Sequence, residues 1–290
     1  MFADPREVAD ALAAVGYLPD AGVATAAYLA LTMQRPLFLE GDPGVGKTAL
    51  AQALAQITGS ELVRLQCYEG IDATQALYDW NFPRQILHLR AAGDSADTAE
   101  VEKSLYGRDF LIVRPILRAL ESGGAVLLID EIDRADDEFE AFLLEVLADN
   151  AITVPELGTI TAQAPPLVVL TSNRTREVHD ALKRRCLYHW VEHPDPAREV
   201  EIVLRHVPCA VGRIAREVAV VVRHLREMGL VKPPGVAESI DWAQALLMVR
   251  AARLDGEAAA ATLGAAVKYR EDQLRVRREV LPGLDALLSQ

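Results

Sequence analysis

The chain has 290 residues, of which 51% are hydrophobic and 25% are charged, and its formal net charge is −12 at pH 7. This composition is ordinary for a globular protein, and the length allows one large domain and a smaller one. Because a negative protein surface repels phosphate, the charge argues against a general grip on nucleic acid or on an anionic membrane.

Three cysteines and the first residues of the chain bear on the compartment. Cys67, Cys186 and Cys209 are widely spaced and contain no C-x-x-C pair, so the sequence indicates neither a disulfide framework nor a zinc site. The N-terminal sequence carries acidic residues early and lacks the apolar stretch of a secretion signal. No apolar run approaches the roughly 18 residues that a membrane-spanning helix needs. We therefore expect a cytoplasmic protein that does not associate with a membrane.

The first expected elements are two helices and a strand. Residues 6–15 and 22–32 have helical patterns, and the sequence Leu18-Pro19-Asp20 separates them. Pro36 ends the second helix, and the apolar run up to residue 40 suits a buried strand.

A glycine-rich loop follows this strand and leads into the helix-favouring sequence of residues 49–57. Its residues, with the first helical residue after them, are Gly41, Asp42, Pro43, Gly44, Val45, Gly46, Lys47, Thr48 and Ala49. The loop fits the pattern G-x-x-x-x-G-K-[ST], whose backbone N–H groups close around phosphate oxygens at a helix N-terminus. Lys47 is then expected to reach the β- and γ-phosphates of ATP, and Thr48 to ligate Mg²⁺. The alternative is a glycine-rich turn that binds nothing.

The next part of the chain holds an aromatic section. Residues 61–66 alternate in polarity as a second strand does, and residues 67–90 then place Tyr78, Trp80 and Phe82 within a polar frame. Residues 91–100 are small, polar and acidic, which predicts a mobile loop.

An acidic pair follows the third expected strand. Residues 115–120 favour a helix, and residues 125–129 form an unbroken apolar run that is typical of a parallel strand covered on both faces. The run ends in Asp130-Glu131, and open α/β sheets bind ligands at the carboxyl ends of their strands. Asp130 suits Mg²⁺ through its water shell, and Glu131 suits orienting or deprotonating an attacking water.

The remaining elements divide the chain. Residues 138–148 form an amphipathic helix, residues 152–160 predict a hairpin, and residues 167–171 predict a buried strand that ends in Ser172-Asn173. Residues 174–185 are interpreted as largely helical and end in a basic cluster. Beyond about residue 192 only helical patterns remain, so we expect an α/β domain over 1–192 and a helical domain over 193–290.

The order of these features resembles that of the AAA+ ATPases, and of the MoxR group among them. Besides the loop, the segment L-L-I-D-E-I-D-R-A (127–135) and the segment L-K-R-R-C (182–186) are similar to MoxR sequences. The resemblance covers nearly the whole chain and is firmest over residues 35–190. It implies a P-loop AAA+ domain of three αβα layers with a parallel sheet, followed by a small all-α lid.

The resemblance also implies roles for residues outside the loop. Asn173 corresponds to sensor 1, which places the attacking water against the γ-phosphate; the alternative is a residue that only caps the following helix. Arg184 or Arg185 corresponds to the arginine finger that reaches a neighbouring subunit's nucleotide; the alternative is a solvated basic surface. Glu238 stands where many AAA+ lids carry the sensor 2 arginine, so the lid's part in nucleotide binding departs from the family pattern.

Two further segments are similar to the CoxD-type branch of MoxR proteins, which is linked to maturation of carbon monoxide dehydrogenase containing molybdenum and copper. They are L-Q-C-Y-E-G-I-D (65–72) and L-Y-D-W-N-F-P-R-Q (77–85). The resemblance to MoxR proteins as a whole implies an insert in the second helix over about 68–104 and a hairpin before sensor 1 over about 150–162, both of which contact clients or neighbours. The alternative for Tyr78, Trp80 and Phe82 is that they are ordinary core aromatics.

Together these features predict an ATPase that assembles as a ring, a hexamer, and remodels a client protein. The resemblance implies a partner with a von Willebrand A (VWA) domain and a metalloenzyme client, with ATP and Mg²⁺ as cofactors. Two alternatives stay open: a nucleic-acid motor, which the net charge disfavours, and a scaffold that binds ATP without hydrolysing it.

Overall fold

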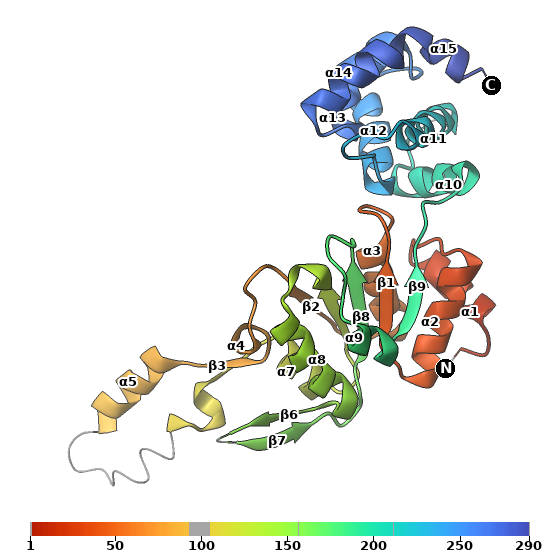
Figure 1. The fold of residues 1–290 in the computed structure, drawn as a ribbon. Helices are drawn as coiled ribbons and strands as arrows, with labels where there is room; N and C mark the ends of the chain where they lie inside the picture. The colour runs from red at the N-terminus through yellow and green to blue at the C-terminus, as the bar shows by residue number, and fades with distance from the viewer. Residues whose placement is uncertain (1, 93–104, 156, 211, 290) are drawn as a thin grey trace. The chain divides into compact units, whose positions relative to one another are not determined.

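The structure is a computed structural model, and it describes residues 2–92, 105–155, 157–210 and 212–289. The ribbon is drawn in Figure 1. The helices are α1 (Pro5–Ala14), α2 (Ala21–Met33), α3 (Lys47–Thr58), α4 (Ala73–Ala76), α5 (Phe82–Ala92), α7 (Pro115–Glu121), α8 (Asp137–Asp149), α9 (Asp180–Arg185), α10 (Pro196–His206), α11 (Gly212–Glu227), α12 (Val236–Met248), α13 (Gly256–Ala266), α14 (Arg270–Glu279) and α15 (Leu284–Leu287). The strands are β1 (Leu37–Glu40), β2 (Leu62–Gln66), β3 (Tyr78–Trp80), β4 (Leu111–Val113), β5 (Val126–Asp130), β6 (Ala151–Val154), β7 (Gly158–Thr161), β8 (Leu167–Ser172) and β9 (Leu187–Trp190). The short 3₁₀ helices of the described residues are η1 (Arg108–Phe110), η2 (Ile132–Arg134) and η3 (Leu281–Gly283).

These elements form two compact units, each described on its own. The first unit holds the residues up to Ala11 together with Asp20–Glu40 and Thr48–Trp190. The second holds the helical region from Val191 onward and two short segments, Leu12–Pro19 and Gly41–Lys47. The glycine-rich loop therefore packs with the second unit, although β1 before it and most of α3 after it belong to the first.

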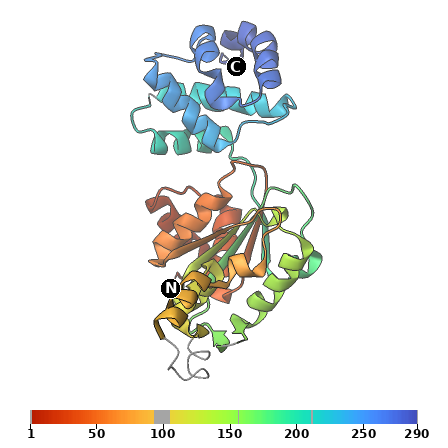
Figure 2. The ribbon, with the colours of Figure 1, turned by 90° about the vertical axis from the view of Figure 1, so that its left-hand side faces the viewer.

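A five-stranded parallel sheet of order β2-β5-β8-β1-β9 forms the centre of the first unit. β1 and β5 are buried along their whole length, which explains their unbroken apolar sequences. Consecutive parallel strands are joined by helical crossovers, and Figure 2 shows the sheet between the N-terminal helices on one side and α8 on the other. The predicted αβα layers are confirmed.

The core of the first unit follows the alternation of side chains along its strands. Phe38, Leu127 and Leu170 belong to one buried cluster, into which Leu117 of α7 and Leu143 of α8 also pack. The neighbouring strand residues, among them Leu37, Leu39, Leu128 and Val169, are fully buried as well, and alternation directs them to the opposite face. Both faces are thus apolar, and polar chemistry is left to the strand ends.

The aromatic section forms a small ribbon beyond the main sheet. β3 and β4 pair antiparallel, and Figure 1 shows α5 extending away from the sheet. Trp80 packs edge-on against Tyr78 and Tyr106, with ring centroids 6.1 and 5.4 Å apart, respectively. Phe82 is 58% exposed, so the interpretation of these aromatics as ordinary core residues is wrong for Phe82. The predicted loop at 91–100 lies almost entirely outside the described residues.

The end of the first unit differs from the sequence analysis in two ways. The helix expected over 174–185 is wrong in its first half, because only Asp180–Arg185 is helical. The preceding residues are instead held in a non-helical path by hydrogen bonds to buried acids. The strand β9 was not anticipated; it pairs parallel with β1 at the edge of the sheet. The predicted hairpin, β6–β7, is confirmed, and the predicted buried strand at 167–171 is β8, which lies beside β5.

The second unit is built from α10 to α15. Its core surrounds the fully buried Trp242, whose indole N–H donates to Thr262 Oγ1 at 2.9 Å. Among the described residues, no helix has the length and apolar character that crossing a bilayer requires.

Candidate nucleotide-binding site

Asp130 lies at the carboxyl end of β5 and is only 3% exposed. Its Oδ1 accepts from the Thr48 hydroxyl at 3.0 Å and from the Thr171 hydroxyl at 2.5 Å. Its Oδ2 accepts from Arg64 Nη2, also at 2.5 Å. A hydroxyl and a carboxylate in contact form the hard oxygen set that Mg²⁺ prefers, so these residues fit the expected metal.

Glu131 has an unusual backbone, with φ +56° in the left-handed region. A non-glycine residue in this conformation carries strain, and such strain persists only where the surroundings impose it. Here the Glu131 N–H donates to Thr171 Oγ1 at 2.9 Å. Thr171 is 1% exposed and lies on the adjacent strand β8, so one buried hydroxyl fixes both acidic residues.

The Glu131 carboxylate has three polar neighbours. Oε2 accepts from Arg134 Nε at 2.7 Å and from Gln66 Nε2 at 3.2 Å. Oε1 lies 3.4 Å from Asn173 Nδ2, a long hydrogen bond. The structure thus brings together two residues that sequence reasoning placed in one site, Glu131 and Asn173.

Asn173 does not cap a helix. The N-cap of α9 is His179, six residues later, so the alternative interpretation of Asn173 as a helix cap is wrong. Buried Asp133 holds its loop instead: Asp133 Oδ1 accepts from Asn173 N at 3.2 Å, and Oδ2 accepts from Thr175 N at 2.8 Å and Thr175 Oγ1 at 2.7 Å. This anchoring directs the Asn173 amide toward Glu131.

The glycine-rich loop folds around its own lysine. Lys47 is buried, and its Nζ donates to the carbonyl oxygens of Gly41 and Asp42 at 2.7 and 2.8 Å. Gly44 has φ +80°, and a Cβ there would lie 3.0 Å from Gly235 Cα, so both conformation and space require glycine. A Cβ on Gly41 would come within 2.4 Å of the Val191 carbonyl oxygen.

The start of α12 packs against this loop within the second unit. Val236 N donates to the Gly44 carbonyl oxygen at 3.0 Å. Glu238 Oε2 accepts from Gly235 N at 2.9 Å, as the third residue of a helix does when it caps the helix start. The same Oε2 would lie 3.3 Å from a Cβ on Gly44. The acid that departs from the family pattern therefore sits at the phosphate-binding loop.

Two ionisable groups near these residues have shifted pKa values. Burial, followed by the positive charge of Arg226, lowers the pKa of His193, whose Nε2 lies 3.4 Å from Asp42 Oδ2. Burial, followed by the negative charges of Asp130 and Asp133, raises the pKa of the Cys67 thiol to about 12. Cys67 is therefore protonated at neutral pH and is unsuited to act as a nucleophile.

The two candidate finger arginines differ in their surroundings. Both are exposed at the end of α9, and the Arg185 guanidinium donates to the Leu144 carbonyl oxygen of α8. The Arg184 guanidinium has no hydrogen bond or ion pair with any part of the chain that the structure describes. Arg184 is thus the arginine whose guanidinium remains available to an outside group.

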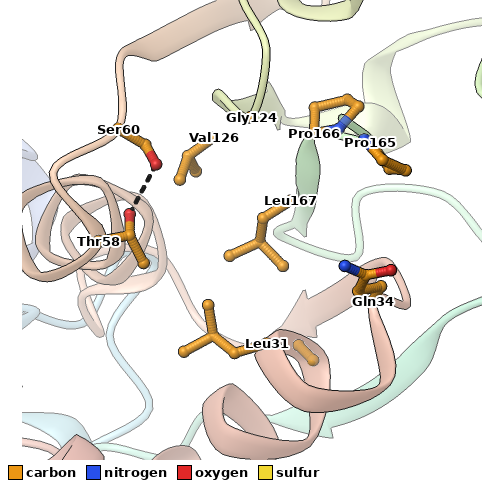
Figure 3. Close-up of a pocket in the computed structure, with 10 residues that line it drawn as sticks. Leu31, Gln34, Thr58, Ser60, Gly124, Val126, Pro165, Pro166 and Leu167 are labelled. Carbon is orange, nitrogen blue, oxygen red and sulfur yellow. Dashed lines mark hydrogen bonds between the residues drawn. The ribbon is translucent and has the colours of Figure 1, made fainter. Parts of the chain in front are cut away.

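A pocket of about 170 Å³ lies elsewhere in the first unit (Figure 3). Val126 and Leu167, which line it, are the first residues of β5 and β8, so the pocket is at the edge of the sheet opposite Asp130. None of its lining side chains is titratable. They belong to Ala30, Leu31, Gln34, Thr58, Ser60, Gly124, Val126, Pro165, Pro166 and Leu167. This pocket does not share the chemistry of the acidic edge.

Several residues of the site were missed by the sequence analysis. Thr171, Asp133, Arg64 and Gln66 contact the predicted residues, but none belongs to the P-loop pattern or to the acidic pair. The alternating polarity of residues 61–66 could have suggested Gln66, because Gln66 is the last residue of that predicted strand. In the structure Gln66 lies opposite Asp130 in the strand register. Among the described residues, no group of three or more His, Cys, Asp or Glu side chains could hold a metal ion by itself.

The sheet order, the glycine-rich loop after β1 and the carboxylates after β5 define a P-loop nucleotide-binding protein with the AAA+ fold. The chain belongs to the AAA domain family, dynein-related subfamily, whose sequence model matches residues 36–186. A RuvB variant from Thermotoga maritima has the same fold, with a TM-score of 0.52 and 18% identity over 99% of this chain and 82% of that one.

Two curated proteins show the extent of sequence similarity. The uncharacterized protein YehL of Escherichia coli is 30% identical over 186 residues, which cover 60% of this chain and 46% of YehL. The gas vesicle ATPase GvpN1 of Halobacterium salinarum is 24% identical over 206 residues, covering 68% of this chain and 58% of GvpN1. The chain thus spans about half the length of these relatives.

Proposed function

We propose that the chain hydrolyses ATP to ADP and phosphate and uses the cycle to remodel a client protein. The observation that supports this most strongly is the convergence of Thr48, Asp130, Glu131 and Asn173 at one end of the sheet, where Thr171 binds both acidic residues. A glycine-rich turn that binds nothing has no need for two carboxylates that are fixed in this way, one of them buried.

The roles of the residues follow from their chemistry. The oxygen of a water attacks the γ-phosphorus, the bond from that phosphorus to the β–γ bridging oxygen breaks, and the water's proton passes to Glu131. Asn173 orients the water, Lys47 neutralises charge on the β- and γ-phosphates, and the loop N–H groups bind phosphate. Thr48 and Asp130 would hold Mg²⁺, which supplies positive charge to the phosphate oxygens. Glu131 can accept the proton at Oε1, the oxygen that faces Asn173, because Arg134 and Gln66 bind Oε2.

The ATP site is shared between two copies of the chain. Arg184, whose guanidinium is available, completes the neighbour's site in a ring, a hexamer, in the cytoplasm. Similarity to MoxR proteins of the CoxD type suggests a metalloenzyme client and a partner with a VWA domain. These finer assignments rest on sequence resemblance alone.

The test is the ATPase rate per subunit as a function of protein concentration. Wild-type protein should show a rate that rises with concentration, and Glu131→Gln should abolish turnover while retaining ATP binding. Arg184→Ala should lower the rate by about 10³-fold or more, since a finger arginine contributes about 10³–10⁵. Arg185→Ala should have the smaller effect because its guanidinium already contacts α8.

The other two candidate functions predict different results. A non-hydrolysing scaffold would bind ATP and release no phosphate even when assembled. A nucleic-acid motor would be stimulated by DNA with a steep dependence on salt. A rate independent of concentration and of both arginines would leave an ordinary single-chain nucleotidase.

A further inference from the structure

Two stretches of the first unit are joined by a series of buried acid contacts. Acids from β5 to α8 face hydrogen-bond donors from the chain between β8 and α9. Asp133 holds the Asn173 loop, as described above. Glu140, in the first turns of α8, is 1% exposed and makes the next contacts along the same stretch.

Glu140 binds the chain immediately before α9. Its Oε2 accepts from His179 N, the N-cap residue of α9, at 2.7 Å. Its Oε1 pairs with Arg176 Nη2. Arg176 also donates from Nε to the Ala135 carbonyl oxygen at 3.0 Å, and from Nη1 to the Glu177 carbonyl oxygen at 2.8 Å. One carboxylate and one guanidinium thus fix the entry into α9.

The other end of α9 is also held. Arg35 Nη2 donates to the carbonyl oxygens of Arg184 and Arg185 at 3.2 and 3.1 Å. α9 also packs against α8. A helix of six residues has little stability of its own, so these contacts determine where Arg184 points.

We propose that the Arg176–Glu140 pair is a positioning device for the arginine that this chain presents to its neighbour. Asp133 serves the chain's own site through Asn173, whereas Arg176 and Glu140 serve the adjacent subunit's site through α9. The inference rests on the proposed shared-site ATPase and assigns these two residues an effect in trans. Sequence reasoning gave neither of them a role.

A small displacement of α9 is enough to matter. A shift of about 1 Å in a catalytic group can cost about 100-fold in rate. Arg176→Lys keeps the positive charge beside Glu140 but loses the planar fork that reaches the Ala135 carbonyl oxygen. Glu140→Gln keeps an acceptor for His179 N and removes the charge. Both variants should therefore loosen α9 and leave the chain's own phosphate-binding residues unchanged.

The experiment mixes subunits at constant total concentration. Glu131→Gln subunits cannot hydrolyse ATP themselves but present an intact α9. The reference is the Arg184→Ala, Arg185→Ala double variant, which lacks a finger and keeps its own site. Each test variant is assayed alone and after mixing with Glu131→Gln subunits, together with the Kd of a fluorescent ATP analogue and the Tm.

We expect Arg176→Lys and Glu140→Gln alone to lose about 100-fold in rate, with analogue Kd values within about twofold of wild type. Mixing with Glu131→Gln subunits should restore both to the level of the mixed reference. Asp133→Asn should stay inactive in the mixture, because its defect lies in its own site. Arg118→Ala removes an exposed ion pair with Glu61 in the same unit and should keep the wild-type rate.

The other possible outcomes would overturn either the positioning role of Arg176 and Glu140 or the shared site itself. If the reference is restored by mixing but Arg176→Lys and Glu140→Gln are not, these residues act in cis and the inference is overturned. A wild-type rate for Arg176→Lys and Glu140→Gln alone overturns it as well. If the reference itself keeps the wild-type rate or is not restored, the shared site is absent and the inference falls with it. If one variant does not fold, as its Tm shows, the other carries the test.

Discussion

At the scale of single residues, the Thr171 hydroxyl determines the geometry of both acidic groups. It donates to Asp130 Oδ1 and accepts from Glu131 N, so its donor and acceptor capacities are both used within the site. The second of these bonds holds Glu131 in its left-handed conformation, which a non-glycine residue avoids without support.

Thr171→Val should therefore damage both activity and stability. The side chain keeps its shape, but the partly buried Glu131 N–H loses its partner, at a cost of about 0.5–1.5 kcal/mol in the free energy of unfolding. The ATPase rate should fall at least about tenfold, because both acidic residues lose the hydroxyl that they share. Urea unfolding and steady-state ATPase assays measure the two effects.

Thr171→Ser is the matched control, since it retains the hydroxyl and loses only a methyl group. It should keep most of the activity. Equal losses in the valine and serine variants would show that packing of the methyl group, and not the hydroxyl, is what the site requires.

The acidic pair could be predicted at this scale because its signal is local: an apolar run that ends in two carboxylates. Thr171 and Asp133 could not be assigned in this way. Their roles depend on the register that places β8 beside β5 and on the turn of η2. Asn173 was identified through family resemblance, and the structure adds the reason why its amide faces Glu131.

At the scale of elements, the first turn of α12 places a negative charge at the phosphate-binding loop. Glu238 is retained in its position by the hydrogen bond from Gly235 N, and Gly44 lies directly beside it. The Glu238 carboxylate caps the N-terminus of α12, but its negative charge repels the phosphate that the loop is expected to bind.

Glu238→Gln should tighten ATP binding by about threefold at low salt, because it removes one negative charge near the phosphates. The effect is modest because water between the charges weakens their repulsion. Glutamine at this position preserves the cap, so the thermal stability should not change. Fluorescence titration with an ATP analogue at several salt concentrations measures the effect, which should diminish as salt screens the charge.

Glu238→Ala separates the cap from the charge. It should show the same gain in affinity but lose about 0.5–2 kcal/mol of stability with the cap. Weaker ATP binding in the glutamine variant would instead mean that the carboxylate assists binding, and the electrostatic argument would be wrong.

Elements whose sequences show a regular apolar pattern were predicted well, and elements shaped by tertiary contacts were not. β1, β5 and β8 are recognisable in the sequence because each contains a continuous run of apolar residues that is buried in the structure. β9 contains Tyr188 and His189, is only partly buried and lies at the sheet edge, so its sequence carries a weaker signal. Residues 174–179 have helix-compatible side chains, yet Asp133 and Glu140 bind their backbone N–H groups in a non-helical path.

At the scale of the whole molecule, the net charge is −12, yet the surroundings of the partly buried His193 disfavour its protonated form. Lowering the pH toward 5.5 leaves most carboxylates with ordinary pKa values ionised. His193 responds in this range, because burial and the charge of Arg226 lower its pKa below the ordinary value of 6.5, against the opposing influence of Asp42 and Glu199. The unfolded chain then binds a proton that the folded chain does not.

The stability of the protein should therefore fall as the pH drops below about 6.5, since stability rises with pH wherever the unfolded state binds more protons. His193→Gln removes this group, so its free energy of unfolding should decline less between pH 7.5 and pH 5.5 than that of wild type. Urea unfolding at both pH values measures the difference. The remaining five of the six histidines are common to both proteins and cancel in the comparison. An identical decline in the two proteins would mean that His193 titrates in the folded state as it does in the unfolded chain, and that its burial does not oppose the charge.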